Sequence, residues 1–310
     1  MRVAGRAGVG LNRLLGSRIG GALGILTYHR ISPNVPGLPK PPHNVPPGRL
    51  RQQLAGLLER GFTVWPLSRI LDCRAQGAAI PPRTVVVTFD DGFQSVYANA
   101  WPILRELQVP ATLFLSTAFL DSDDAFWFDS WGKAYCDRLP SETYRPLTSA
   151  QAEEMAREGL VELGAHTHTH EDFRHRPEDF RKDLQVSVDM VRSRFGLQDV
   201  SFAFPFGSTH HGFAGDELVA TAKQTGVVCG LTTESVVVDI QSDPFCWGRF
   251  TAFPWDTAET LSAKLQGWYS WAPKLRRRIA AALPEVSHRV AGRSTGVASD
   301  PDCDCVSEDS

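Results

Sequence analysis

The chain has 310 residues, of which 42% are hydrophobic and 22% are charged, and its formal net charge is −3. This length can bury a full hydrophobic core and the composition is that of an ordinary globular protein, so we expect one main domain with irregular ends. The small negative charge offers no field to attract nucleic acid, and we expect no nucleic-acid partner.

The first predicted element is an amphipathic segment over residues 1–24, in which arginines alternate with leucines and isoleucines. The arginines interrupt the apolar residues, so neither a signal peptide nor a membrane span is predicted, and a cytoplasmic location is expected. A short helix packed on the protein itself is the preferred interpretation. The alternative is a basic helix that makes peripheral contact with a membrane surface.

Strand-like and helix-like patterns alternate after this segment. Strands are predicted at Ile25–His29, Thr84–Phe89, Ala111–Leu115, Leu160–Ala165, Val200–Phe204 and Val227–Leu231, with a weaker one around Phe245–Phe250. Helices are predicted at Arg49–Arg60, Gln94–Gln108, Ser149–Glu158, Pro177–Phe195, Gly215–Gln224 and Thr257–Gly267. This alternation implies an α/β fold, an irregular (β/α) barrel with about seven parallel strands and helices outside. We assign this domain to residues 25–272, followed by a basic and then disordered tail over residues 273–310.

Two adjacent carboxylates, Asp90 and Asp91, directly follow the β-branched run Thr84–Val87 and precede Gly92. Neighbouring aspartates at a strand end repel each other unless a cation or a network of donors takes up their charge. One of them can bind a metal while the other stays free as a base. This division of roles requires further metal ligands elsewhere in the chain.

Those ligands are predicted in the segment Gly164–His170, which carries His166, His168 and His170 after an apolar run. If the segment is helical, His166 and His170 share a face and His168 points away; if it is extended, all three share a face. Either geometry brings two imidazoles to one ion. Two histidines, one aspartate and an open position are typical of a catalytic zinc site, whereas a polar surface loop is the alternative interpretation.

These segments resemble the polysaccharide deacetylases, the NodB homology domain of carbohydrate esterase family 4. The resemblance rests on Thr88–Gly92 and on the H-T-x-T-H pattern of residues 166–170, and it extends from about Ile25 to Trp268. It implies a NodB-type barrel in which Asp91, His166 and His170 hold Zn²⁺ or another divalent transition metal, while Asp90 is the catalytic base. The segment Phe202–Gly207 resembles the proline-aromatic loop of the family, which implies that the Phe206 backbone N–H stabilises the oxyanion.

Two departures from the family pattern concern the remaining catalytic groups. Many members carry an arginine that orients the catalytic aspartate at the position of Ala203, and we expect Arg249 to replace it; an ordinary surface charge is the alternative for Arg249. The strand that begins at Ile25 resembles one that usually ends the domain and stands first in a permuted subgroup acting on exopolysaccharides. This order implies that His29 is the general acid. Asp129 lies in a segment, Trp127–Asp129, similar to one in that subgroup, and its role is not assigned.

All these candidate residues fall at the carboxyl ends of predicted strands, where a parallel barrel builds its active site. The resemblance implies a metal-dependent hydrolase that removes acetyl groups from N-acetylated, or O-acetylated, oligo- or polysaccharides. The alternatives are an amide hydrolase for a small non-sugar substrate and a non-catalytic barrel that binds saccharide, the latter favoured only by Ala203. Five aromatic residues near the expected mouth of the barrel could stack on sugar rings, but core packing is the commoner fate of an aromatic side chain, and stacking is predicted only for Phe206. The five are Phe126, Trp127, Trp131, Phe206 and Trp255.

Overall fold

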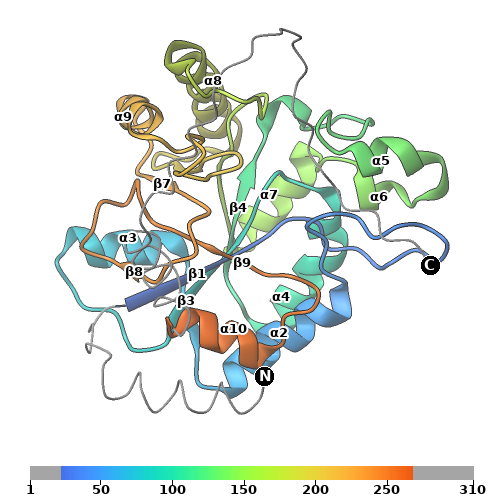
Figure 1. The fold of residues 1–310 in the computed structure, drawn as a ribbon, viewed down its shortest axis with the longest axis horizontal. Coiled ribbons are helices and arrows are strands. Elements are labelled where there is room, and N and C mark those ends of the chain that lie inside the picture. Colours follow the sequence, from blue (N-terminus) through green and yellow to red (C-terminus); the bar gives the residue numbers. More distant parts are fainter. Residues whose placement is uncertain (1–21, 268–310) are drawn as a thin grey trace, which may run out of the picture. The chain divides into compact units, whose positions relative to one another are not determined.

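A curled sheet of nine strands forms the centre of the structure, a computed structural model that describes residues 22–267 (Figure 1). The strands are β1 (Ala22–Tyr28), β2 (Thr63–Val64), β3 (Thr84–Phe89), β4 (Ala111–Leu115), β5 (Val161–Ala165), β6 (Ser201–Ala203), β7 (Cys229–Leu231), β8 (Val238–Asp239) and β9 (Phe250–Thr251). Seven of them pair in parallel in the order β9–β1–β3–β4–β5–β6–β7. The α/β barrel with about seven parallel strands is therefore confirmed.

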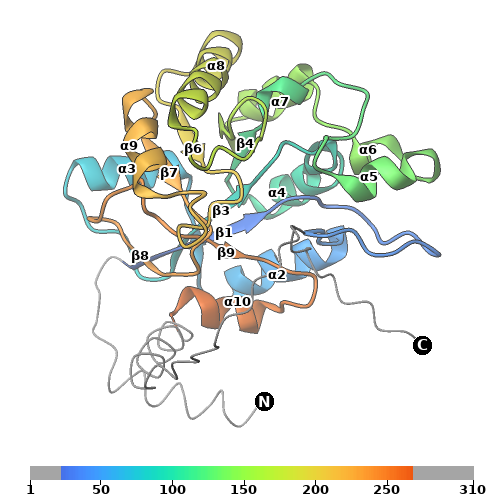
Figure 2. The same cartoon turned by 45° about the horizontal axis from the view of Figure 1, so that its top comes forward.

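Helices lie around the outside of this sheet (Figures 1 and 2). They are α2 (Pro47–Glu59), α3 (Leu67–Ala75), α4 (Trp101–Leu107), α5 (Ser130–Tyr135), α6 (Ser141–Tyr144), α7 (Ser149–Arg157), α8 (Pro177–Phe195), α9 (Asp216–Gln224) and α10 (Ala258–Leu265). Short 3₁₀ turns occur at Thr117–Phe119 and Cys136–Arg138, and a π-helical turn at Val96–Ala100. None of the described helices is long and apolar enough to cross a membrane.

Several element boundaries differ from the sequence-based prediction. The predicted helix Gln94–Gln108 is present as a helical stretch, but a π-helical turn interrupts it before α4, and Pro102 removes a backbone donor near their junction. The weak strand around Phe245–Phe250 is reduced to β9. The sequence analysis missed β2 and β8, each of which has two residues and therefore no readable alternation.

The two terminal segments fall mainly outside the described residues. The predicted amphipathic segment 1–24 lies there except for its end, because β1 begins at Ala22. The predicted tail 273–310 lies there entirely.

Local signals in the sequence set the ends of the helices. Helix α7 begins with a capping box, in which Thr148 accepts from the Gln151 N–H and the Gln151 side chain accepts from the Thr148 N–H. Helix α8 starts with Pro177 in its first turn and ends at Gly196, whose φ of 68° is left-handed. These helices cover the strands that carry the candidate site.

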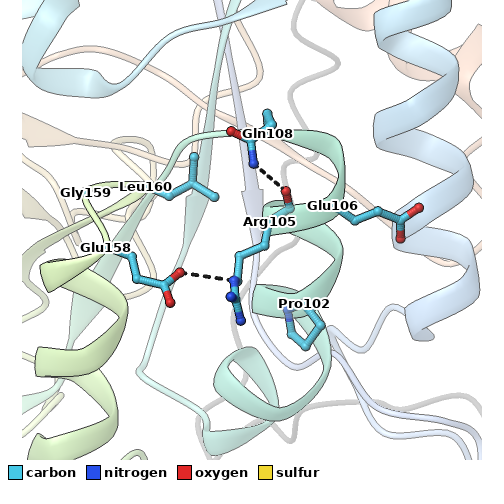
Figure 3. A pocket seen from close by; sticks show the side chains of 7 residues that line it. All are labelled: Pro102, Arg105, Glu106, Gln108, Glu158, Gly159 and Leu160. Atoms are coloured by element: carbon cyan, nitrogen blue, oxygen red, sulfur yellow. Dashed lines mark hydrogen bonds and ion pairs between the residues drawn. The ribbon is translucent and has the colours of Figure 1, made fainter.

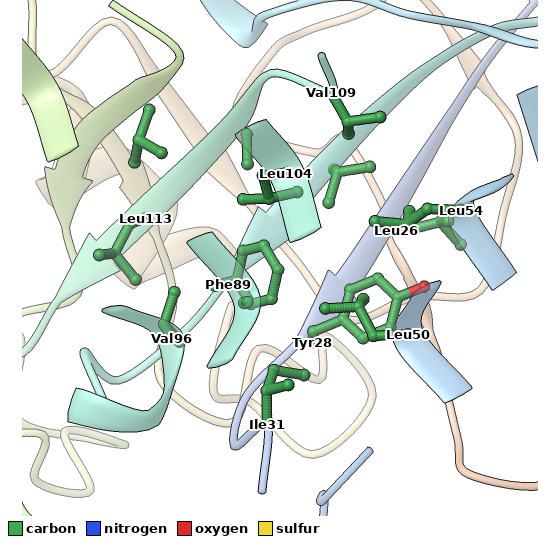
Figure 4. Close-up of a cluster of buried hydrophobic side chains, with 14 of the residues drawn as sticks. Leu26, Tyr28, Ile31, Leu50, Leu54, Phe89, Val96, Leu104, Val109 and Leu113 are labelled. Atoms are coloured by element: carbon green, nitrogen blue, oxygen red, sulfur yellow. The ribbon is translucent and has the colours of Figure 1, made fainter. Parts of the chain in front are cut away.

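Strand β3 is buried along its whole length, as expected for a parallel strand covered on both faces. Val85, Val87 and Phe89 pack on one face with the helices, in a cluster that includes Leu50 and Leu104 (Figure 4). Val86 packs on the other face in a cluster that also contains residues of β1, β4, β6 and β7. Because side chains alternate along each strand, the inside of the curled sheet is filled and only its rim is available for a site.

Parallel pairing brings the carboxyl ends of the strands to one rim. Tyr28 at the end of β1 lies opposite Phe89 at the end of β3, and Leu115 of β4 lies opposite Ala165 of β5. The residues that follow these strands therefore meet at the same edge of the sheet.

Candidate metal centre and active site

Asp91, His166 and His170 converge at this edge. Asp91 Oδ1 lies 3.4 Å from Nε2 of His166 and 3.4 Å from Nε2 of His170. All three residues are buried, and their potential ligand atoms lie within 4.8 Å of one another. The structure thus brings together the three residues predicted to hold a metal.

The segment that carries the histidines is neither helical nor extended. Thr167 and His170 have left-handed φ values of 63° and 55°, so the chain turns sharply between the two candidate ligands. Asp183 of α8 holds this turn by accepting hydrogen bonds from the backbone N–H groups of His168 and Thr169. His168 points away and its Nδ1 lies 2.9 Å from Thr117 Oγ1, so the alternative in which all three histidines share a face does not occur.

The chemistry of these three residues fits a divalent transition metal. His166 Nδ1 lies 2.8 Å from the carbonyl oxygen of Ala203, which can only accept, so Nδ1 carries the proton and Nε2 presents its lone pair toward Asp91. A buried carboxylate and two imidazole nitrogens are ligands that Zn²⁺ prefers.

Asp90 is held by Arg249. Arg249 Nη1 and Nη2 donate to Asp90 Oδ1 and Oδ2 at 2.6 Å and 2.8 Å, and Arg249 is fully buried. The interpretation of Arg249 as a surface charge is therefore wrong. Burial alone would raise the pKa of Asp90, but Arg249 and the nearby histidines lower it below its ordinary value, so the carboxylate is ionised at neutral pH.

His29 directly follows β1 and lies near Asp90. Its Nε2 lies 4.0 Å from Asp90 Oδ2, and its ring packs against His43 at 4.9 Å between centroids. Burial lowers the pKa of His29 to about 4, despite the nearby charges of Asp91 and Asp90. The imidazole is therefore neutral at pH 7. The contact with His43 was not predicted from the sequence.

Phe206 lies at a sharp turn beside His170 of the metal cluster. Its φ is 60°, and the following residue, Gly207, also has a positive φ of 58°. The Phe206 carbonyl accepts a hydrogen bond from Thr233 Oγ1, whereas no described residue accepts from its backbone N–H. The ring meets His170 edge-on at 5.0 Å and is 44% exposed. The predicted donor is thus available beside the metal cluster.

The five candidate stacking aromatics divide by exposure. Trp127 is 50% exposed and Trp255 is 71% exposed, with Trp255 stacked on Phe253 at 4.6 Å. Phe126 and Trp131 are buried and pack in the interior, the commoner fate expected for them. The sequence analysis also missed Phe128, whose ring stacks on His170, and it left Asp129 without the ion pair that it forms with Arg30.

A surface depression elsewhere in the molecule is separate from this site. It lies between the end of α4 and the turn before β5, and the Arg105–Glu158 ion pair crosses it at 3.1 Å (Figure 3). Its residues precede β4 and β5, so it lies at the amino ends of the strands. The candidate active site is at the opposite, carboxyl ends.

The sequence profile described as "Polysaccharide deacetylase" matches residues 78–230. This range includes Asp90, Asp91, His166 and His170, whereas His29 and Arg249 lie outside it. A poly-beta-1,6-N-acetyl-D-glucosamine N-deacetylase of Escherichia coli strain K12 is 36% identical over 118 residues, which are 38% of this chain and 17% of that protein. The chain thus spans about a sixth of the length of this relative. The protein of the same name from Staphylococcus epidermidis is 25% identical over 197 residues, 61% of each chain.

Solved structures share the fold. The structure of IcaB from Ammonifex degensii has a TM-score of 0.64 at 23% identity and covers 80% of this chain and 97% of that one. The Streptococcus pyogenes deacetylase PplD has a TM-score of 0.64 at 21% identity, with coverage of 79% and 98%. The profile match and the shared barrel agree with each other: residues 78–230 of this chain match the polysaccharide deacetylase family.

Proposed function

We propose that this protein is a metal-dependent hydrolase that removes acetyl groups from N-acetylated saccharides. The observation that carries the proposal is the division between the two adjacent aspartates. Asp91 faces two histidine Nε2 atoms, whereas Asp90 faces Arg249 and His29. This division supports a metal-binding role for Asp91 and a proton-transfer role for Asp90.

Asp91, His166 and His170 would hold the metal, and we propose Zn²⁺ or another divalent transition metal. When bound, the ion supplies Lewis-acid chemistry, polarising the acetyl carbonyl and lowering the pKa of water. The three ligands leave a coordination position open, as expected for a catalytic rather than a structural site.

Asp90 would act as the general base. Its lowered pKa keeps it ionised at neutral pH, and the two hydrogen bonds from Arg249 hold its carboxylate in one orientation. As a water molecule attacks the acetyl carbon, Asp90 accepts its proton. The Phe206 N–H donates to the carbonyl oxygen as negative charge develops there.

His29 would carry that proton to the leaving group. Because its pKa of about 4 makes it neutral at rest, His29 can accept the proton gathered at Asp90, 4.0 Å away, and become charged only during the reaction. It then protonates the sugar nitrogen as the bond between carbon and nitrogen breaks. The products are acetate and a free amino sugar, with the water oxygen in the acetate.

The substrate we propose is a polymer of N-acetylated hexosamine. The similar proteins of Escherichia coli and Staphylococcus epidermidis are named for deacetylating poly-β-1,6-N-acetyl-D-glucosamine. The exposed rings of Trp127, Phe206 and Trp255 offer flat apolar surfaces for sugar rings. A small non-sugar amide would not require such surfaces.

The test is acetate release from N-acetylated and O-acetylated oligosaccharides, with and without added Zn²⁺, using Asp90→Asn as the control. Zinc-dependent release that Asp90→Asn abolishes supports the proposal. The substrates that react show whether the acetyl group is removed from nitrogen or from oxygen. Release from a small amide only would favour the alternative hydrolase. Saccharide binding without any release and without a metal requirement would favour a non-catalytic barrel.

A further inference from the structure

The two candidate histidine ligands are oriented in different ways. His166 is held by the hydrogen bond from Nδ1 to the Ala203 carbonyl. His170 Nδ1 is buried and has no hydrogen-bond partner among the described residues. A metal-binding histidine usually has its second nitrogen held by an acceptor. The orientation of the His170 ring must therefore depend on packing.

Phe128 provides that packing. Its ring stacks on the His170 ring with 4.0 Å between centroids and 26° between planes, whereas Phe206 meets His170 edge-on at 5.0 Å and 69°. Stacking constrains the plane of the imidazole, and the edge-on contact of Phe206 adds a second ring against it. Rotation of His170 would move Nε2 away from Asp91.

The position of Phe128 is itself set by its neighbours. Phe126 stacks on Phe128 at 5.1 Å and is fully buried. The Trp127 indole donates to the Thr169 carbonyl at 2.9 Å, which ties this segment to the turn that carries His170. Asp129 forms a buried ion pair with Arg30.

Arg30 makes this ion pair a rigid anchor. Its Nε donates to the Thr143 carbonyl at 2.9 Å, and its guanidinium lies over the Phe93 ring at 4.4 Å. Arg30 also directly follows His29 in the chain. One short segment, Phe126–Asp129, therefore spans from the His29 side of the site to the metal ligand His170.

We propose that Phe128 is a positioning residue for His170 and that the Arg30–Asp129 ion pair holds Phe128 in place. The inference rests on the metal site of the proposed function. Loss of the stacked ring would let the imidazole rotate in its pocket, so the apo protein would lose part of its preorganisation for the metal. Substitutions that disturb the orientation of a ligand cost about 10- to 100-fold in metal affinity.

The test is the Zn²⁺ dissociation constant of metal-free protein, measured by competition with a chromophoric chelator. Phe128→Leu should weaken binding by about tenfold or more, whereas Phe128→Tyr, which keeps a flat ring, should stay within about twofold of the parent. The matched control is Phe119→Leu, because Phe119 contacts Phe126 and Phe128 but is not among the described rings that contact His170. Parent-like binding by Phe128→Leu, or equal weakening by Phe119→Leu, would overturn the proposal.

A second pair of measurements separates positioning from folding. The absorption spectrum of the Co²⁺-loaded protein reports ligand geometry, and we expect Phe128→Leu to alter it while Phe119→Leu leaves it unchanged. Asp129→Asn keeps the oxygen that caps α5 at Gly132 but removes the charge that pairs with Arg30, so it should also weaken Zn²⁺ binding, by less than Phe128→Leu. Unchanged affinity in Asp129→Asn would overturn the anchoring role.

Failure of the positioning role of Phe128 can be distinguished from failure of the proposed deacetylase activity. If the parent binds Zn²⁺ but releases no acetate from any substrate, the proposed activity fails and the dissociation constants still decide the role of Phe128. If the parent binds no divalent transition metal, the metal site and this inference both fail.

Discussion

The guanidinium of Arg249 donates two hydrogen bonds to the carboxylate of Asp90, although the two residues are 159 positions apart in the chain. The contact forms because β9 pairs with β1 and β1 pairs with β3, so the end of β3 lies two strands from the start of β9. This contact supports the proposal that Arg249 orients Asp90 in place of an arginine at position 203. Ala203 instead contributes its carbonyl oxygen to His166.

Arg249→Lys should reduce kcat for acetate release by about ten- to a hundredfold, about 1.4–2.7 kcal/mol, with little change in KM. A lysine keeps the positive charge but cannot donate two parallel hydrogen bonds, so Asp90 would lose its orientation. Steady-state kinetics on an N-acetylated oligosaccharide measure the effect. Arg74→Lys is the control, because Arg74 donates to a backbone carbonyl far from Asp90. An unchanged kcat for Arg249→Lys would contradict the orienting role.

Asp90→Asn and Asp91→Asn should separate catalysis from metal binding. Asp90→Asn removes the base and should lower kcat by at least about a hundredfold while Zn²⁺ affinity is retained. Asp91→Asn should lower Zn²⁺ affinity itself, because it removes the charged ligand that faces both histidines. Calorimetric titration with Zn²⁺ measures the metal affinity of both variants, and acetate release measures their kcat. Equal loss of metal affinity in the two variants would reject the division of roles.

The stability of the metal-free protein should fall as the pH falls from 7 to 5. His29 has a pKa of about 4 in the folded protein and 6.5 as its ordinary value, so between these pH values the unfolded chain binds more protons. The free energy of unfolding should therefore decrease by about 2 kcal/mol over this range through His29 alone.

Urea unfolding in the presence of a chelator, at pH 7 and pH 5, measures this dependence. His29→Gln should show a smaller decrease than the parent, whereas His175→Gln, which alters an exposed histidine, should behave as the parent does. An identical decrease in the parent and His29→Gln would show that His29 does not carry the effect.

Trp255→Ala should impair the hydrolysis of long oligosaccharides more than that of short ones. Trp255 is 71% exposed and stacked on Phe253, which follows β9 beside the end of β1, so it can bind a sugar ring next to the reacting one. KM for a long substrate should rise about tenfold while KM for the monomer stays unchanged. Because the side chain is exposed, thermal stability should change little. An equal effect on monomer and polymer would argue against a stacking platform.

The sequence by itself determined the features that depend on neighbouring residues. The run Thr84–Phe89 reads as a buried strand, so Asp90 and Asp91 had to lie at a strand end, and the alternation of elements predicted a parallel barrel. Short spacing likewise brought His166 and His170 within reach of one ion. The sequence left the course of the chain between them open, because left-handed φ values at Thr167 and His170 arise from contacts with α8 and not from their residue types.

Only the tertiary structure decided the contacts between distant segments. Only the family resemblance pointed to Arg249 as the partner of Asp90, because no local pattern indicates that this arginine is buried. Nothing near Asp129 indicates Arg30. Both pairs depend on which strands and loops become neighbours. The same holds for Phe128, whose aromatic character is equally compatible with core packing until His170 is placed against it. Local patterns specify where strands end and which ligands they carry, whereas strand order and packing specify what surrounds those ligands.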